Sequence, residues 1–206
     1  MITHSDPQVF LKSCTPEPVA LIAEAARVCY RAEATKSDED LVKMLLWKQH
    51  LSPLEHASAT FGIRCNRGVS HELVRHRIAA YSQESTRYCD YNKDKFDGQI
   101  SVLRPYGMTM AQQEIWKKYA ALAEEGYQAM RKAGAAPQIA RDLLPICTSV
   151  TIVATMNFRQ WLHVIMQRSS PKAHPQIQHV AQQICALLHV VAPCIFPQKW
   201  DPVPAI

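Results

Sequence analysis

Two strand-forming segments stand among much longer stretches with helical periodicity. Residues 57–65 (ASATFGIRC) alternate between apolar and polar side chains, and residues 148–156 (TSVTIVATM) are rich in β-branched residues, which favour pleated strands. Helical spacing of apolar residues is seen over residues 17–30, 37–50, 109–133, 158–168 and 173–191. The pattern predicts an α+β fold that is rich in helix and has a small sheet.

Capping and turn residues set the expected ends of these elements. Ser37 is placed as a helix N-cap, with Glu39 and Asp40 in the first turn, and Gly134 follows the long helix as a C-terminal stop. Asn66-Arg67-Gly68 predicts a turn before a short helix over residues 69–77. Residues 79–91 predict an irregular loop with extended pieces, residues 100–103 a short strand, and residues 137–144 one or two helical turns.

Size and composition favour one globular body. The 206 residues are 48% hydrophobic and contain no repeat or Gly/Ser linker, so we expect a single domain over residues 1–206. No apolar run approaches the roughly 18 residues of a membrane span. The first residues, MITHSDPQVF, lack the basic and apolar regions of a signal peptide. We therefore expect a cytoplasmic protein with no membrane partner.

Cysteine usage argues against a disulfide framework or a metal finger. The count is odd and no C-x-x-C pair occurs, so reduced and mostly buried thiols and no metal site are expected. The seven residues are Cys14, Cys29, Cys65, Cys89, Cys147, Cys185 and Cys194.

Basic residues gather in one region of a chain whose net charge is only +5. Five arginines and no lysine fall between Arg64 and Arg87, and the planar arginine fork suits phosphate. Residues 75–88 (RHRIAAYSQESTRY) combine three of them with a histidine, two serines and an amide, as binding loops do; a solvated basic loop is the alternative. On one helix, Arg75 and Arg77 would be about 200° apart and would face opposite ways.

This segment resembles the signature of a known family. Arg75-His76-Arg77, then seven residues, then Ser85, is similar to the signature of the flavin-dependent thymidylate synthases. Leu54-Glu55-His56, the run 140–145 (ARDLLP), Asn157-Phe158-Arg159 and Arg168 resemble further motifs of that family, in the same order along residues 54–178. Each match alone is weak, whereas the ordered set is specific.

The resemblance implies a fold, an activity and a set of ligands. The family fold is a helix-rich domain around a small, mostly antiparallel sheet, assembled as a homotetramer with active sites at subunit junctions. The implied activity is that of a methyltransferase: reductive methylation of dUMP at C5 to dTMP. Methylenetetrahydrofolate is the carbon donor, FADH2 the hydride donor and NADPH the flavin reductant. Small molecules and further copies of the chain are thus the implied partners, without nucleic acid.

Residue roles carry over from the same resemblance. Arg168 is the implied catalytic residue, placed by the uracil to favour an N3-ionised, C5-nucleophilic base. The implied dUMP-binding residues are Glu72, Arg75, Gln83, Glu84, Ser85, Arg87, Arg141 and Arg168. The implied FAD-binding residues are His56, Ser58, Arg75, His76, Arg77, Gln83, Asn157, Arg159 and His163.

Helical geometry is consistent with this division of roles. Arg159 and Arg168 are nine residues apart, roughly 180° around a helix, so they should serve different ligand groups. Arg159 and His163 share a face. Asn157 and Gln160 also form a capping-box pattern, so a helix cap is the alternative role for Asn157. Ser85 has no readable His-Asp pairing, which favours a phosphate or backbone contact over a nucleophile.

Departures from the commoner family pattern leave a different acceptor open, and the arginine-rich loop leaves a nucleic-acid-binding function open. Ala80 stands where serine is frequent, and His163 where asparagine is common. A C5 methylase of another uridine monophosphate, such as UMP, is therefore the first alternative. A nucleic-acid-binding module is the second, although more lysine and exposed aromatic residues would be expected. No cysteine lies in a segment like the nucleophile motif of the cysteine-dependent thymidylate synthases.

Overall fold

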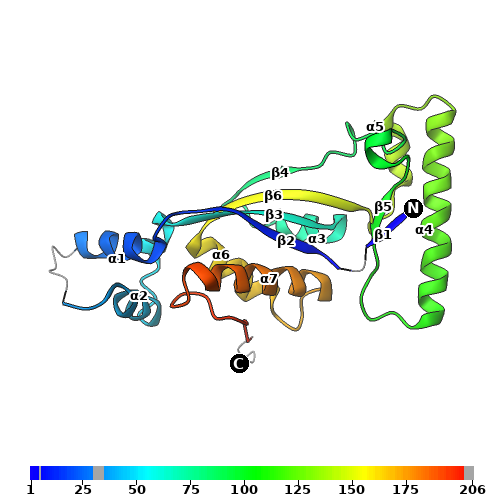
Figure 1. Cartoon of the computed structure of the whole chain (residues 1–206). Helices are drawn as coiled ribbons and strands as arrows, with labels where there is room; N and C mark the ends of the chain where they lie inside the picture. The colour runs from blue at the N-terminus through cyan, green and yellow to red at the C-terminus, as the bar shows by residue number, and fades with distance from the viewer. Residues whose placement is uncertain (5, 30–34, 202–206) are drawn as a thin grey trace. The chain divides into compact units, whose positions relative to one another are not determined.

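A computed structural model describes residues 1–4, 6–29 and 35–201 of the chain (Figure 1). The chain forms two compact units. Unit 1 comprises Met1–Pro7, Arg64–Arg75 and Ser82–Ile152, and unit 2 comprises Gln8–Ile63, His76–Tyr81 and Val153–Ile206. The predicted α+β class is confirmed, since helices and two small sheets make up the structure. The larger sheet has the strand order β2-β3-β6-β4, and the smaller pairs β1 with β5.

Unit 2 holds most of the helices. Its elements are α1 (Pro18–Val28), α2 (Asp38–Trp47), the 3-10 helix η1 (Ser52–His56), α6 (Phe158–Arg168), α7 (Pro175–Val191) and strand β2 (Gln8–Cys14). The predicted N-cap is present, because Ser37 Oγ accepts a hydrogen bond from Asp40 N at 3.1 Å. Figure 1 shows α1 beside α2 and α6 beside α7, and both pairs are in contact.

Aromatic packing fixes α6 against strand β3 (Ser58–Asn66). Trp161 and Phe61 meet edge to face with ring centroids 5.0 Å apart, and Trp161 Nε1 donates to Ala59 O at 3.0 Å. On β3 and on β6 (Ser149–Asn157), the Oγ1 atoms of Thr60 and Thr155 are hydrogen bonded at 2.9 Å. Burial of both rings, with the indole N–H satisfied, gives α6 a fixed platform within unit 2.

Unit 1 is organised around the long helix α4 (Met110–Lys132). Its other elements are β1 (Ile2–His4), α3 (Arg67–Leu73), the 3-10 helix η2 (Asp94–Phe96), β5 (Ser101–Leu103), α5 (Pro137–Ala140) and the 3-10 helix η3 (Arg141–Leu143). Strand β1 is parallel to β5, with Thr3 opposite Val102. A capping box between Thr109 and Gln112 begins α4, and Gly134 follows it with φ of 90°, the left-handed conformation in which glycine carries no steric penalty.

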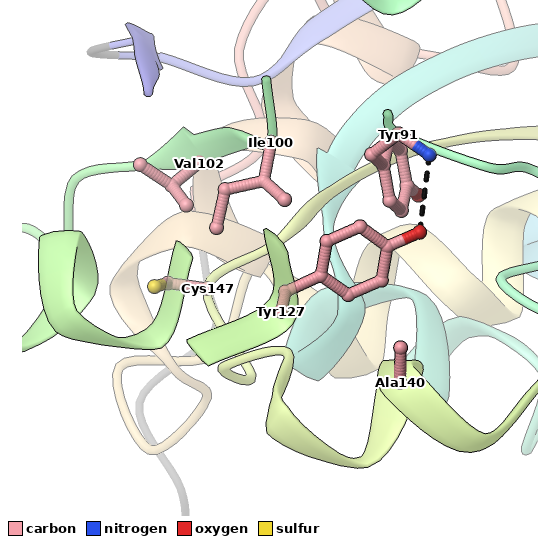
Figure 2. Close-up of a cluster of buried hydrophobic side chains, with 6 residues drawn as sticks. All are labelled: Tyr91, Ile100, Val102, Tyr127, Ala140 and Cys147. Carbon is pink, nitrogen blue, oxygen red and sulfur yellow. Dashed lines mark hydrogen bonds between the residues drawn. The ribbon is translucent and has the colours of Figure 1, made fainter. Parts of the chain in front are cut away.

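Six side chains form a buried apolar cluster in unit 1 (Figure 2). Tyr127 of α4 belongs to this cluster, and its hydroxyl accepts a hydrogen bond from Tyr91 N at 3.1 Å, the dashed line in Figure 2. The cluster therefore joins α4 to the loop that leads away from strand β4 (Ala80–Gln83). Its members are Tyr91, Ile100, Val102, Tyr127, Ala140 and Cys147.

The structure differs from the sequence prediction near α3. Asn66 was predicted to begin a turn, but its Oδ1 accepts from Val69 N at 2.8 Å and caps a helix that starts at Arg67. That helix ends at Leu73 rather than at residue 77. Arg75 and Arg77 therefore lie beyond it, so the opposite directions expected for two arginines on one helix do not apply to them.

Other elements agree with the expected ones within a few residues. Strands β1 and β2 were not predicted, because residues 2–14 show no clear apolar alternation; β2 lies at an edge of its sheet, where neighbouring packing demands less of the sequence. Tyr30, the last residue of the first expected helix, lies outside the described residues.

Three findings bear on the broad functional classes. All seven cysteines carry free thiols, with Cys29 exposed and Cys65 fully buried. Within the described residues, no set of three or more His, Cys, Asp or Glu side chains is arranged to hold a metal ion. Among the helices of the described part, none has both the length and the apolar character to cross a membrane.

Candidate functional site

Helix α6 presents three of the predicted flavin residues to one pocket in unit 2. Asn157 caps the helix, since its Oδ1 accepts from Gln160 N at 2.8 Å, and Phe158 N donates to Ala57 O at 2.8 Å. Arg159 and His163 follow on one face of the helix, as predicted. The pocket has a volume of about 550 Å³ and is lined by Gln49, Leu51, Glu55, Ile78, Asn157, Arg159, Gln160, Leu162, His163 and Met166.

Two charged side chains in the lining of this pocket form an ion pair. Arg159 Nη1 donates to Glu55 Oε1 at 2.5 Å, and both side chains are about half exposed, at 51% and 45%. Solvent screening keeps such a pair weak, so Arg159 can exchange Glu55 for an anionic ligand. Glu55 was not among the predicted site residues, although the motif Leu54-Glu55-His56 had been noted.

The remaining predicted flavin residues of unit 2 lie outside the lining of that pocket. His56 ends η1 and Ser58 begins β3, and both side chains are exposed. The backbone of Ser58 is tied to Thr15, whose Oγ1 accepts from Ser58 N at 2.9 Å. Arg77 is exposed in the segment before β4.

A second group in unit 2 joins Arg168 to His76. Arg168 Nε donates to His76 Nε2 at 3.0 Å, and the His76 ring meets the His163 ring edge to face at 5.8 Å. His76 is only 6% exposed. Its burial, aided by the nearby Arg168 and His163, lowers the pKa of His76 to about 4. The imidazole is therefore neutral near pH 7, with an unprotonated Nε2 that accepts the bond.

Tyr81 fixes the backbone at the same place. Its hydroxyl donates to His76 O at 3.0 Å, which closes the short segment between the two residues. Burial raises the pKa of Tyr81 to about 12, although Arg168 opposes that shift. The phenol therefore keeps the proton that it donates.

In unit 1, the predicted phosphate residues Ser85 and Arg87 lie on a turn, and the predicted nucleotide residue Arg141 follows the neighbouring helix. Ser85 Oγ accepts from Arg87 N at 3.3 Å, and Ser85 O accepts from Cys89 N at 2.8 Å. Arg87 Nε donates to Gln138 Oε1 of α5 at 3.1 Å. Arg141 begins η3 directly after α5, and both arginines are exposed. Ser85 thus makes a backbone contact, one of the two roles expected for it, and the phosphate contact stays a prediction.

Glu84 is held against β6 rather than exposed. Tyr91 Oη donates to Glu84 Oε1 at 3.0 Å, and Glu84 N donates to Thr151 O at 2.9 Å. Burial and the carboxylate both raise the pKa of Tyr91. Glu84 also lines a pocket of about 220 Å³ within unit 1, together with Ile2, His4, Arg64, Tyr91, Lys95, Phe96, Asp97, Gln99, Ser101, Ser149 and Thr151.

A buried ion pair anchors the end of this loop to α4. Arg131 Nη2 and Nε donate to the two carboxylate oxygens of Asp90 at 2.8 and 3.0 Å. These hydrogen bonds lower the pKa of the Asp90 carboxyl against the opposing effect of burial. Tyr127 bonds both Asp90 Oδ1 and Tyr91 N, so the loop carrying Glu84, Ser85 and Arg87 is fixed at its far end.

The other predicted nucleotide residues are placed less distinctively. Glu72 is half-buried on α3, Arg75 is exposed just after that helix, and Gln83 is half-buried at the end of β4. Their roles stay predictions.

The pocket on α6 has the chemistry to hold part of a flavin dinucleotide. Its lining combines a guanidinium, an imidazole, three amides and the Glu55 carboxylate with the apolar side chains of Leu51, Ile78, Leu162 and Met166. Polar groups of this kind suit phosphate and ring carbonyls, and apolar groups suit a planar ring system. The residues present therefore fit the cofactor that the family resemblance implied.

Comparison with known proteins gives one consistent result. The profile of the family described as "Thymidylate synthase complementing protein" matches residues 10–194. A flavin-dependent thymidylate synthase of Geobacter sulfurreducens is 34% identical over 92% of this chain and 85% of its own length. That of Pyrococcus abyssi is 35% identical over 84% of this chain and 75% of its own.

Solved structures agree with the sequence comparison. The UMP/dUMP methylase PolB from Streptomyces cacaoi, bound with 5-Br dUMP, has a TM-score of 0.80 at 25% identity, with 95% of each chain covered. The same protein bound with 5-Br UMP has a TM-score of 0.77. PolB therefore shares the fold of the present chain, and its two structures carry brominated uridine nucleotides.

Proposed function

We propose that this chain, which belongs to the family of flavin-dependent thymidylate synthases, methylates dUMP at C5 to form dTMP in the cytoplasm. The proposed cofactor is FAD, with NADPH and methylenetetrahydrofolate as co-substrates. The family match over residues 10–194 carries the proposal, and the arrangement of Asn157, Arg159 and His163 around one pocket supports it.

The phosphate of the nucleotide is the proposed ligand of the arginines of unit 1. Arg87 and Arg141 are both exposed, and Arg87 is held by Gln138, three residues before Arg141. Two guanidinium groups and the Ser85 hydroxyl supply donors for an anionic oxygen. Because the Asp90–Arg131 pair and Tyr127 hold the loop, these donors need little ordering when the nucleotide binds.

The base is activated by Arg168 in this proposal. Uracil C5 is a weak nucleophile, and negative charge drawn onto N3 and O4 makes it attack an activated carbon. A guanidinium stabilises that charge and stays protonated at working pH. The Arg168 guanidinium is bonded through Nε to neutral His76, so this contact does not cancel its charge.

When bound, reduced flavin would supply the hydride that completes the methyl group. The proposed groups of this chain that bind the flavin are the Asn157 amide, the Arg159 guanidinium and the His163 imidazole. Ile78 and the other apolar side chains of the pocket would keep water from the flavin ring. Glu55, which pairs with Arg159, would release it to the cofactor.

Flavin reconstitution and turnover test the proposal together. The purified protein should be yellow or take up FAD, with a thermal shift, and should then form dTMP from dUMP, methylenetetrahydrofolate and NADPH. Protein without flavin should give no product. A chain that binds no flavin, by visible absorbance and by thermal shift, would contradict the assignment and would return attention to nucleic-acid binding.

A second acceptor follows from the structural comparison. PolB, of similar fold, is a UMP/dUMP methylase, so UMP is the alternative substrate for this chain. The ratio of the kcat/KM values for dUMP and UMP decides between the two substrates. The two nucleotides share the uracil and the phosphate and differ in the ribose 2′-hydroxyl, so a difference in kcat/KM reports how the site treats that hydroxyl.

A homotetramer is the proposed assembly. Several large apolar side chains on one side of α4 are exposed in the chain, among them Ile115, Tyr119 and Leu122 at helical spacing. Light scattering should give four times the chain mass; a monomer that still turns over would exclude the oligomer as a requirement.

A further inference from the structure

We propose that His76 is a positioning residue for Arg168, holding its guanidinium through the bond from Nε to His76 Nε2 while Tyr81 fixes the His76 backbone. The inference rests on the proposed function for the role of Arg168. It gives His76 a task distinct from the flavin contact that the family resemblance implied.

The geometry of the bond suits such a role. Arg168 is the last residue of α6 and has a long flexible side chain, whose ordering costs entropy. The bond to His76 Nε2, at 3.0 Å, restrains the side chain close to its charged end. It is made by Nε and does not involve Nη1 or Nη2, which form the other edge of the fork.

The acceptor of this hydrogen bond is an imidazole rather than a carboxylate. A carboxylate would hold the guanidinium equally well but would offset the positive charge that an electron-rich uracil needs. A neutral imidazole accepts the bond without that compensation. Burial is the main cause of the low pKa that keeps His76 neutral, and Arg168 and His163 from α6 add to it because they disfavour a second cation.

Neighbouring side chains also hold His76 itself in place. A histidine that orients another residue needs a fixed backbone and a fixed ring. Tyr81 Oη donates to the His76 carbonyl at 3.0 Å, and the His163 ring packs edge to face on the imidazole. With 6% exposure, His76 has little freedom to turn toward solvent.

Two substitutions separate the acceptor from the ring. His76→Gln places an amide oxygen near the position of Nε2, whereas His76→Leu fills a similar volume without an acceptor. Single-turnover methylation, with prereduced flavin and saturating dUMP, should fall at least about tenfold for leucine and stay within about threefold for glutamine. Flavin affinity should change little in either variant, and thermal melting shows that each is folded.

A double-variant comparison tests whether His76 acts through Arg168. In an Arg168→Ala background, His76→Leu should cause no further loss of methylation, because the group that it positions is gone. Multiplied losses, or a loss of flavin affinity in His76→Leu, would overturn the inference and would indicate a direct flavin role.

A spectroscopic readout keeps the inference independent of turnover. The Arg168 Nε–H signal in NMR should exchange slowly with solvent in the native protein and in His76→Gln, and rapidly in His76→Leu; Tyr81→Phe should weaken the protection. Equal exchange in the native protein and His76→Leu would refute the positioning role. Absence of thymidylate formation by the native protein, with that protection intact, would instead refute the proposed function alone.

Discussion

Arg168 is the residue on which the proposed chemistry depends most. Arg168→Lys keeps a charge but loses the planar fork, and Arg168→Ala loses both. Charge stabilisation of this kind contributes about 3 kcal/mol, so both variants should lose dTMP formation by at least about a hundredfold, with alanine worse. Both should retain flavin, because Asn157, Arg159 and His163 line the pocket on α6 and Arg168 does not.

The measurement is single-turnover methylation with prereduced flavin and saturating dUMP, after flavin content has been determined by absorbance. Near-normal methylation by Arg168→Ala would place the activation of the base elsewhere. The alternative role for Arg168 is an interaction with the helix dipole at the C-terminus of α6. In that case Arg168→Ala should lower the stability without lowering the rate of methylation.

The cysteines should be dispensable for turnover. No thiolate attack on the base is needed when flavin supplies hydride, and burial opposes a thiolate: it raises the pKa of Cys65 to about 12 and also raises that of Cys147. Alanine at Cys65, Cys89 or Cys147 should therefore leave kcat within about tenfold. A thousandfold loss at one of them, in a variant with an unchanged melting temperature, would indicate covalent catalysis.

Single residues differ in how far the sequence reveals them. Arg159 and His163 share a face of α6, and Asn157 caps that helix, as helical spacing and the capping pattern predicted, because both follow from local rules. Glu55 and Tyr81 were missed. Arg159, the partner of Glu55, is 104 residues away, so their pairing depends on how the chain folds back. Tyr81 bonds the His76 carbonyl only five residues away, but across an irregular segment with no helical or strand period to indicate the contact.

At the scale of elements, the cap of α6 offers a test with a matched control. Asn157 caps α6 in unit 2 and lines the pocket, whereas Thr109 caps α4 in unit 1 and lines neither the α6 pocket nor the Glu84 pocket. Each alanine variant should lose about 1 kcal/mol of unfolding free energy. Only Asn157→Ala should also weaken flavin binding, measured by titration of the apoprotein.

Equal flavin affinity in the two variants would leave Asn157 with the capping role alone. Conversely, an unchanged unfolding free energy in Asn157→Ala, measured in urea, would show that its helix is held by packing of Trp161 and Phe158 rather than by the cap.

Elements were predictable where local signals agree with packing. Residues 158–168 form a helix with the expected bounds, and residues 109–133 differ by one residue at each end. The short helix α3 was misplaced because Asn66, a residue that suits both turns and N-caps, was read as a turn. Strand β2 has mostly exposed residues at a sheet edge, so burial imposed no apolar alternation there for the sequence to display.

At the scale of the whole molecule, the predicted ligand residues are divided between the two units. Glu84, Ser85, Arg87 and Arg141 belong to unit 1, with most other predicted nucleotide residues, while most predicted flavin residues and Arg168 belong to unit 2. Sequence patterns assign such residues to a reaction through family resemblance. They do not state which copy of the chain supplies each one, since chain-to-chain pairing depends on surfaces rather than on motifs.

Mixing of inactive variants tests whether different subunits supply the two arginines. Arg141→Ala and Arg168→Ala should each be nearly inactive alone. In the proposed tetramer, after random mixing, a site that takes Arg141 from one chain and Arg168 from another contains both native residues with a probability of about one quarter, from one half for each. Equal mixtures, after dissociation and reassembly, should therefore recover about a quarter of the native rate.

If one chain supplied both residues, no mixture would contain a native site, and activity would stay at the level of the separate variants. A mixture of Arg168→Ala with Arg168→Lys is the matched control and should recover nothing in either case, so that recovery in the first mixture alone identifies sites shared between subunits.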